Sequence, residues 1–233
     1  MEKEELLEGK VLLVDKPLDW TSFQAVNKLK YKIRKQYDLK KFKIGHAGTL
    51  DPRATGLLVI CTGKATKKIS EIQEQKKQYR ATIKLGVQTE SYDTEKPEIL
   101  HQDISHLSNE EIEKALESFV GEISQTPPVF SAIKVDGKRA YDLARQGKEV
   151  EMKSRKTTIY GISSVDIQLP YVSFTVDCSK GTYIRSLAHD IGQSLKVGAY
   201  LSDLRRTKIG DYLVEDAIPN VLENDFQFVD YSF

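Results

Sequence analysis

The side chains whose spacing could do chemistry gather in residues 43–55, KIGHAGTLDPRAT. Two glycines, a proline and the absence of hydrophobic periodicity predict a loop here. Asp51 precedes Pro52, so its backbone is biased away from the helical region and its carboxylate would project from that loop. The carboxylate could be aimed at a ligand, or Asp51 could cap the segment that follows in a tight turn. The turn is the commoner role of an Asp-Pro pair.

The cysteines and histidines show no pattern typical of a catalytic or metal-binding site. Cys61 and Cys178 lie in the apolar runs LLVICTG and YVSFTVDCS, where a thiol behaves as a small hydrophobe, so we predict that both are core residues. A reactive thiolate would need a nearby base or helix N-terminus, and a metal site would need paired ligands at close spacing. Neither pattern occurs, and we expect no metal and no cofactor. Three histidines, His101, His106 and His189, are also not spaced like the ligands of a metal site.

Length and composition exclude several classes of protein. The chain has 233 residues, of which 30% are charged and 39% are apolar, as expected for one large or two small domains with a sizeable core. No run approaches the roughly 18 apolar residues of a membrane span. The beginning, Met1 to Glu5, is acidic and has no apolar signal region, so we expect a cytoplasmic protein.

Charges are segregated along the chain although the net charge is only +1. Residues 28–43 hold eight basic side chains and one acidic side chain, and residues 134–156 hold eight basic and four acidic side chains. In contrast, residues 90–122 hold ten acidic side chains and two lysines. Such segregation would let a nearly neutral protein present a basic face to phosphates. Solvated helix faces that happen to cluster are the alternative, and charge alone does not separate the two.

The order of the expected helices and strands predicts an α+β fold with a mixed sheet, because strands and helices alternate irregularly. A helix is expected from Thr21-Ser22, with Val26, Leu29, Ile33 and Tyr37 on its apolar face. Another should begin at a capping box of Ser108 and Glu111. Residues 87–107 should be a surface connection. Strands are expected at 11–15, 57–63, 78–86, around 121–135, 156–168 and 171–178, and further helices after 63 and at 139–147 and 182–196.

Six segments, in the same order along residues 11–210, match the motifs of one family. GHAGTLDPRATGLLVICTGKATK (45–67) carries every fixed element of the signature Gly-His-x-Gly-x-Leu-Asp-Pro-x-Ala-x-Gly-x-Leu. The other segments are LLVDKPLDWTSF (12–23), QYRATIKLGVQTESYDTE (78–95), QTPPVFSAIKVDGKRAYDLARQGKEV (125–150), CSKGTYIRSLAHDIG (178–192) and LSDLRRTKIG (201–210). Together they resemble the TruB family of bacterial tRNA pseudouridine-55 synthases.

The resemblance implies a pseudouridine synthase catalytic domain over residues 1–210, with a mixed, mainly antiparallel sheet flanked by helices and a central RNA-binding cleft. It implies that the uridine at position 55 of the tRNA T-loop is flipped out and isomerised without a cofactor. The implied partner is the T-arm of tRNA, without guide RNA, and we expect a monomer. Residues 125–150 would be a thumb-like RNA-clasping insertion. Residues 211–233 would be a short acidic tail, without the PUA domain of many family members.

Site residues follow from the same resemblance. Asp51 matches the catalytic aspartate, which could attack covalently or stabilise the developing cation. Arg185 matches the arginine paired with it; judged alone, it would be a surface arginine in a first helical turn. Tyr79 matches the tyrosine that stacks on the flipped base, although a strand tyrosine is more often core. Two further residues, Tyr183 and Leu204, match residues that line the uracil pocket.

The remaining matches concern RNA contacts and loop structure. His46 matches a stacking partner in the RNA cavity, and Lys16 matches the lysine of the first motif, for which a structural role is the other interpretation. Asp19 stands where a glycine is frequent in the family, which predicts a local change of turn. Basic residues of the insertion would bind phosphates, which position RNA without choosing the base; they are Lys134, Lys138, Arg139, Arg145 and Lys148.

Three other functions would use part of the same sequence pattern. A guide-RNA-dependent synthase subunit shares the catalytic block but is longer and depends on its PUA domain. An RNA-folding factor without catalysis would not need Asp51, Tyr79 and Arg185, although RNA folding could coexist with catalysis. A glycoside-processing enzyme usually needs two carboxylates, whereas one stands out here.

Overall fold

The computed structural model describes residues 2–131, 133–135, 137–147 and 150–223. The chain forms two compact units: unit 1 comprises residues Met1–Gln78 and Arg205–Phe233, and unit 2 comprises Tyr79–Leu204. No helix in the described part of the chain has the length and apolar character needed to cross a membrane.

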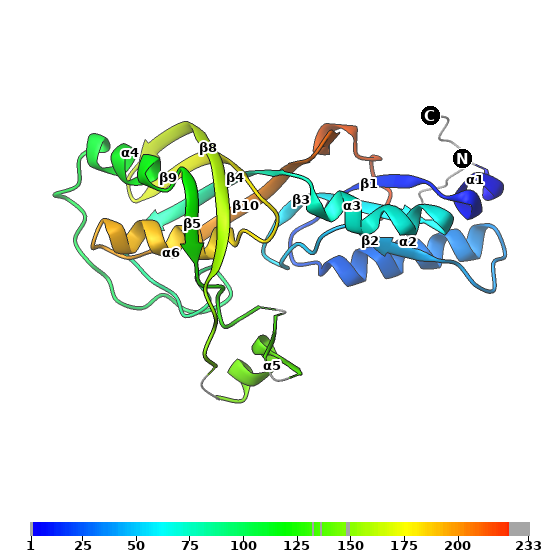
Figure 1. The fold of residues 1–233 in the computed structure, drawn as a ribbon, viewed down its shortest axis with the longest axis horizontal. Coiled ribbons are helices and arrows are strands. Elements are labelled where there is room, and N and C mark those ends of the chain that lie inside the picture. The colour runs from blue at the N-terminus through cyan, green and yellow to red at the C-terminus, as the bar shows by residue number, and fades with distance from the viewer. Residues whose placement is uncertain (1, 132, 136, 148–149, 224–233) are drawn as a thin grey trace. The chain divides into compact units, whose positions relative to one another are not determined.

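Unit 1 is organised around strand β3 (Thr55–Thr62). Strand β1 (Val11–Lys16) pairs with it antiparallel, from Val11 opposite Cys61 to Lys16 opposite Gly56. The short strand β2 (Ile44–His46) also pairs with it antiparallel. Strand β10 (Ala199–Ile209) enters this unit at Arg205 and runs parallel to the start of β3, and β11 (Tyr212–Leu213) pairs with the end of β10 (Figure 1).

Helix α2 (Ser22–Gln36) closes the core of unit 1. Thr21 and Gln24 form a reciprocal capping box, which satisfies backbone donors at the helix start. Leu29 and Ile33 are fully buried and pack in one cluster with Leu12 of β1, each stabilising the fold by about 1.5–3 kcal/mol. The predicted helix start and apolar face are thus confirmed. The other helical elements of unit 1 are α1 (Lys3–Glu8), η1 (Gly63–Lys68), α3 (Ile69–Glu74) and η2 (Val214–Asp216).

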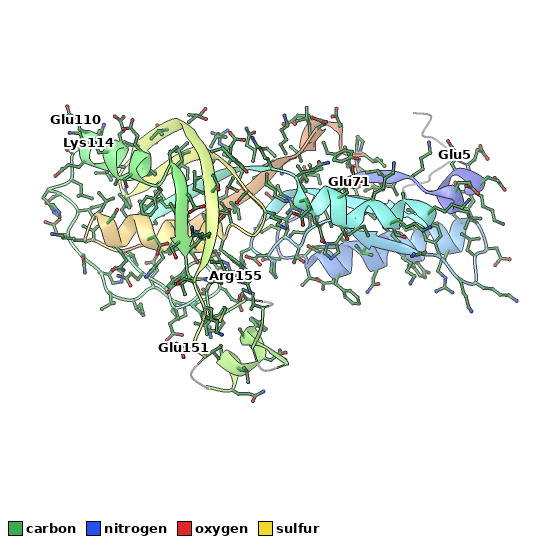
Figure 2. All side chains as sticks on the ribbon, in the orientation of Figure 1. Glu5, Glu71, Glu110, Lys114, Glu151 and Arg155 are labelled. Carbon is green, nitrogen blue, oxygen red and sulfur yellow. The ribbon has the colours of Figure 1, made fainter. Side chains whose placement is uncertain are left out.

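Unit 2 has its sheet in the order β10, β4 (Lys77–Leu85), β9 (Tyr171–Cys178), β8 (Arg155–Gln168) and β5 (Gly121–Gln125). Strands β8 and β9 pair antiparallel, as do β5 and β8. Helix α6 (Ile184–Ser194) and helix α4 (Asn109–Ser118) accompany the sheet. The predicted capping box of Ser108 and Glu111 begins α4, from which Glu110 and Lys114 extend outward (Figure 2).

An insertion separates β5 from β8 (Figure 1). It holds a small antiparallel pair, β6 (Lys134–Val135) and β7 (Lys138–Arg139), followed by α5 (Ala140–Arg145). This segment coincides with residues 125–150, which the sequence assigned to a thumb-like insertion.

The predicted α+β class with a mixed, mainly antiparallel sheet is confirmed, and so is the burial of both cysteines. Two local predictions were wrong, and one strand was missed. Residues 43–55 are not all loop, because Ile44–His46 forms β2. Strand β10 was not predicted. The connection 87–107 is exposed only in part: its first residues bury Thr89, Ser91 and Asp93, since their polar groups bond to one another and to the backbone.

Candidate active site

Asp51 lies half-buried in the loop between β2 and β3, and the N-terminus of α2 holds this loop. The Ser22 hydroxyl accepts a hydrogen bond from the Leu50 amide at 2.8 Å and donates to the Leu50 carbonyl at 3.1 Å. On the other side of Asp51, the Pro52 carbonyl accepts from the Asp19 amide at 2.8 Å. The peptide groups on both sides of the carboxylate are therefore fixed by residues 19–22.

Arg206 of β10 ties the same loop to β3. Its side chain is almost completely buried, and its guanidinium donates to three backbone carbonyls: Nε to Leu57 at 2.8 Å, Nη2 to Gly48 at 3.0 Å and Nη1 to Thr49 at 3.4 Å. Gly56 lets the two strands approach, because a Cβ there would lie 2.3 Å from the Arg206 carbonyl oxygen. A planar fork suits three acceptors in different directions, which a lysine could not reach together.

Lys16 is fully buried at the end of β1. Its ammonium donates to the Trp20 carbonyl at 2.6 Å and to the Pro17 carbonyl at 2.8 Å. Burial lowers the pKa of Lys16 to about 8, although the negative charges of Asp51 and Asp19 act in the opposite direction. The lysine thus shapes the turn that holds the Asp51 loop, and when protonated it places a positive charge in the field of that carboxylate.

Asp19 and His46 complete this side of the site. Asp19 has a φ of 63°, a left-handed conformation that aspartate tolerates better than most residues, so an aspartate fits where the family often has glycine. His46 is half-buried on β2. Burial lowers the pKa of His46, and so does the charge of Arg206. The imidazole is therefore neutral at neutral pH, which suits stacking.

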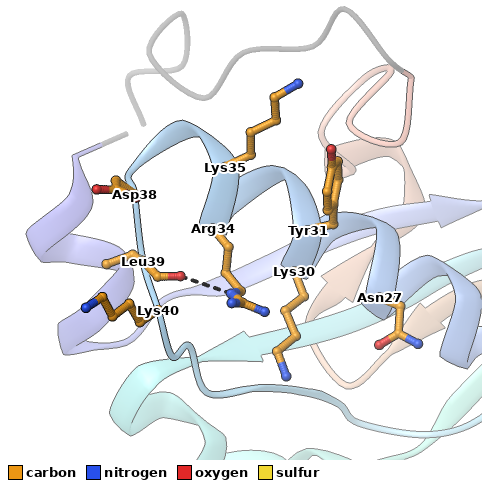
Figure 3. Close-up of a pocket in the computed structure, with 8 residues that line it drawn as sticks. All are labelled: Asn27, Lys30, Tyr31, Arg34, Lys35, Asp38, Leu39 and Lys40. Carbon is orange, nitrogen blue, oxygen red and sulfur yellow. Dashed lines mark hydrogen bonds between the residues drawn. The ribbon is translucent and has the colours of Figure 1, made fainter.

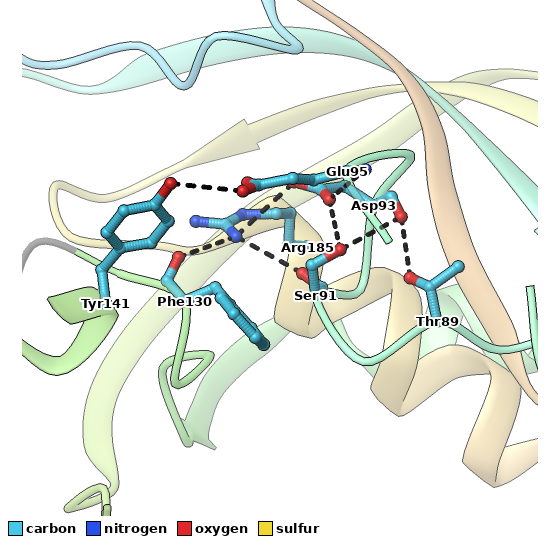
Figure 4. Close-up of polar contacts among 7 residues, drawn as sticks. All are labelled: Thr89, Ser91, Asp93, Glu95, Phe130, Tyr141 and Arg185. Carbon is cyan, nitrogen blue, oxygen red and sulfur yellow. Dashed lines mark hydrogen bonds and ion pairs between the residues drawn. The ribbon is translucent and has the colours of Figure 1, made fainter. Parts of the chain in front are cut away.

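In unit 2, Arg185 is the centre of a buried polar network (Figure 4). It lies in the first turn of α6 and is only 4% exposed, which excludes the alternative of a surface arginine. Its Nη1 donates to the Phe130 carbonyl at 3.0 Å and to the Ser91 carbonyl at 3.3 Å, and lies 3.5 Å from Oδ2 of Asp93. One guanidinium thus joins α6, the insertion and the segment after β4.

Hydrogen bonds also hold the side chain of Asp93, which lies beside Arg185. Its Oδ1 accepts from the Ser91 hydroxyl at 2.6 Å and from the Glu95 amide at 2.9 Å. The carboxylate is thus held by two donors beside a buried arginine. Removing either partner of a buried pair leaves an uncompensated charge, which costs about 3–5 kcal/mol.

The insertion contacts the same segment. The Tyr141 hydroxyl donates to a Glu95 carboxylate oxygen at 3.3 Å, and the Phe130 and Tyr141 rings meet edge to face with centroids 6.3 Å apart. The Lys96 ammonium lies 5.0 Å from the Phe130 ring centre. Strand β7 holds Lys138 and Arg139 and helix α5 ends at Arg145, but the side chains of these residues and of Lys134, and all of Lys148, lie outside what the structure describes.

The predicted pocket residues of unit 2 lie on strands and at a helix start. Tyr79 on β4 and Leu204 on β10 are 9% and 8% exposed. Tyr183 is the N-cap residue of α6. The side-chain amide of Gln125 accepts from the Tyr183 amide at 2.8 Å and donates to its carbonyl at 3.0 Å, so β5 fixes the backbone that carries this ring. Lys16, His46 and Asp51 thus belong to unit 1, whereas the other predicted site residues belong to unit 2.

Comparison with known families gives two matches that together cover most of the chain. Residues 34–184 match the family described as TruB family pseudouridylate synthase (N terminal domain), and residues 185–223 match the tRNA pseudouridylate synthase B C-terminal domain. The chain belongs to the TruB family. The predicted family and enzyme class, an isomerase, are confirmed.

Individual relatives agree with this membership. The chain is 57% identical to tRNA pseudouridine synthase B of Flavobacterium johnsoniae over 94% of this chain and 96% of the relative, and 54% identical to that of Phocaeicola vulgatus over 91% and 90%. Among solved structures, it resembles a chain of a Cbf5-Nop10-Gar1 complex, with a TM-score of 0.67 and 31% identity over 91% of this chain and 52% of that one. It also resembles a chain of an H/ACA RNP bound to a substrate RNA, with a TM-score of 0.65 and 29% identity over 91% of this chain and 51% of that one. The chain spans about half the length of these solved chains.

Two residues of this TruB family site were missed by sequence reasoning. Asp93 lies in a segment whose acids suggested a solvated surface. Its signal is the spacing of Thr89, Ser91 and Asp93, in which short polar side chains alternate as they do when they bond to one another. Arg206 stands in LSDLRRTKIG, where two adjacent arginines alternate between the faces of a strand. That alternation predicts that one of the two points inward.

Proposed function

We propose that this protein is a tRNA pseudouridine synthase that isomerises the uridine at position 55 of the T-loop. The observation that carries the proposal is the family's signature aspartate, Asp51, in a loop fixed by Ser22, Asp19 and Arg206. Relatives named tRNA pseudouridine synthase B, similar over nearly their whole length, support tRNA as the substrate.

The reaction is balanced without a further reactant. The N1–C1′ bond of uridine breaks and a C5–C1′ bond forms; the C5 proton leaves and N1 takes up a proton. Asp51 acts on the nucleotide either as a nucleophile or by stabilising positive charge at the sugar. A rigidly held carboxylate is pre-positioned for either role, which is what catalysis by orientation requires.

We assign the other residues by the same resemblance. Tyr79 stacks on the flipped uracil, with Tyr183 and Leu204 at the pocket wall, because an extruded base needs new stacking and apolar contacts. Arg185 corresponds to the arginine of the family's catalytic pair, and its contact with the Phe130 carbonyl supports coupling of that role to the insertion. Lys138, Arg139 and Arg145 bind phosphates of the T-arm, and His46 stacks in the RNA cavity.

We further propose that the protein recognises tRNA directly, as a monomer without guide RNA. The test uses purified protein and a tRNA transcript with no other RNA present. Pseudouridine is located by chemical adduct formation and primer extension, beside a transcript with cytidine at position 55. The expected result is one new stop at position 55, absent from the cytidine transcript. Modification only after addition of a guide RNA would favour the guide-dependent alternative, and no modification under either condition would refute the proposal.

A further inference from the structure

The solvent-facing side of α2 carries aromatic side chains that the core does not use. Phe23 is 70% exposed and Tyr31 is 61% exposed. With Asn27 they follow a spacing of four residues, which places all three on one face of a helix. The opposite face buries Leu29 and Ile33. Aromatic rings that lie in water beside basic side chains are available to stack on an unpaired base.

The C-terminal half of this face borders a basic groove of about 620 Å³ (Figure 3). Arg34 donates from Nε to the Leu39 carbonyl at 3.0 Å, which holds its guanidinium at the groove. The remaining N–H groups of a guanidinium can still bind a phosphate in two places. Four cations line the groove against one acid; the lining residues are Asn27, Lys30, Tyr31, Arg34, Lys35, Asp38, Leu39 and Lys40.

We propose that this face of α2 binds an unpaired segment of RNA, with phosphates in the groove and a base stacked on Tyr31. Cations that follow a backbone beside exposed aromatic rings form the usual platform for single-stranded nucleic acid, where each stacked base contributes about 1–3 kcal/mol. The proposal rests on the proposed function only in taking RNA as the substrate. The groove is separate from the catalytic loop, since Ser22 and Arg34 are about 18 Å apart along the helix.

An anionic membrane surface could also attract basic and aromatic side chains on a helix. Interfacial helices, however, bury a continuous apolar face in the membrane. The apolar face of α2 packs in the protein core instead, and the exposed stripe offers Phe23 and Tyr31 separated by the polar Asn27. This pattern favours RNA over a membrane.

The test measures binding of the intact protein to full-length tRNA by fluorescence anisotropy across a salt series. Lys35→Gln should reduce the slope of log affinity against log salt by about 0.7–0.9, as loss of one phosphate contact does. Lys114→Gln, an equally exposed helix lysine on α4, is the matched control and should leave the slope at the parent value. Tyr31→Ala should weaken binding about 5- to 150-fold, and Tyr31→Phe should restore it. Benzoylphenylalanine at position 31 should cross-link to unpaired nucleotides of the tRNA.

The proposal is overturned if Lys35→Gln and Tyr31→Ala bind tRNA as Lys114→Gln does and position 31 gives no cross-link. Binding of the parent protein to phosphatidylglycerol vesicles that is lost in Tyr31→Ala, with tRNA binding unchanged, would assign the face to membranes instead. Uridine isomerisation by the parent protein is measured separately. Its absence would remove the proposed function, whereas cross-linking at position 31 without isomerisation would leave the RNA surface standing.

Discussion

Arg206→Lys tests whether the buried guanidinium positions the Asp51 loop. The ammonium keeps the charge but can reach only one of the carbonyls of Leu57, Gly48 and Thr49, which lie in different directions. A hydrogen bond from a charged donor contributes about 1.5–3 kcal/mol, so losing two should cost about 3–6 kcal/mol of unfolding free energy. Loss of the Gly48 contact alone would loosen the loop by about 1.5–3 kcal/mol, a fall of roughly 10- to 150-fold in the chemical step.

The neighbouring Arg205→Lys is the matched control. Arg205 pairs with Asp15 at 2.6 Å with both side chains more than a third exposed, and such pairs contribute about 0–1 kcal/mol. Unfolding free energies come from urea titrations followed by circular dichroism, and rates from single turnovers at saturating tRNA. If Arg206→Lys matches Arg205→Lys in both measurements, the loop is positioned by other contacts and our reasoning is wrong.

Three further predictions follow from the site. Arg185→Lys should lower the single-turnover rate about tenfold or more while affecting tRNA affinity much less, because lysine lacks the planar guanidinium whose Nη1 donates to the Phe130 and Ser91 carbonyls; equal rates would exclude the role. The pKa of Lys16 falls from 10.5 to about 8 on folding, so the unfolded chain holds the extra proton between these values. The parent should therefore gain about 3 kcal/mol of stability from pH 8 to 10.5, and Lys16→Met should lack this gain in urea titrations. Activity should survive EDTA if the tRNA remains folded, and loss that zinc specifically restores would reveal a metal site.

Local signals in the sequence predicted the elements around the site well. The helix cap at Thr21 and the capping box at Ser108 could be read because cap and partner lie within three residues of each other. Strand β10 could not be read in the same way. Its inward positions include Arg206, whose burial depends on carbonyls roughly 150 residues earlier in the chain. A strand that buries an arginine lacks the apolar alternation that marks other strands.

The pairing of Arg185 with Asp93 shows the same limit at the candidate site. Taken alone, an arginine in a first helical turn is expected in solvent, and a polar, acidic segment is expected on the surface. Each is buried because the other compensates its charge. The resemblance identified Arg185 without this information, but the local pattern around neither residue predicts the pair.

The most direct test of the central claim compares Asp51→Asn with Asp19→Asn, an exposed aspartate of the adjoining turn whose side chain pairs with Arg53. Tritium release is measured in single turnovers on tRNA labelled at uridine C5. The parent and Asp19→Asn should release the label of one uridine per tRNA. Asp51→Asn should release none while binding tRNA within about twofold of the parent, because many phosphate contacts supply affinity. Release by Asp51→Asn at a rate near that of the parent would contradict the assignment of Asp51 as the catalytic group.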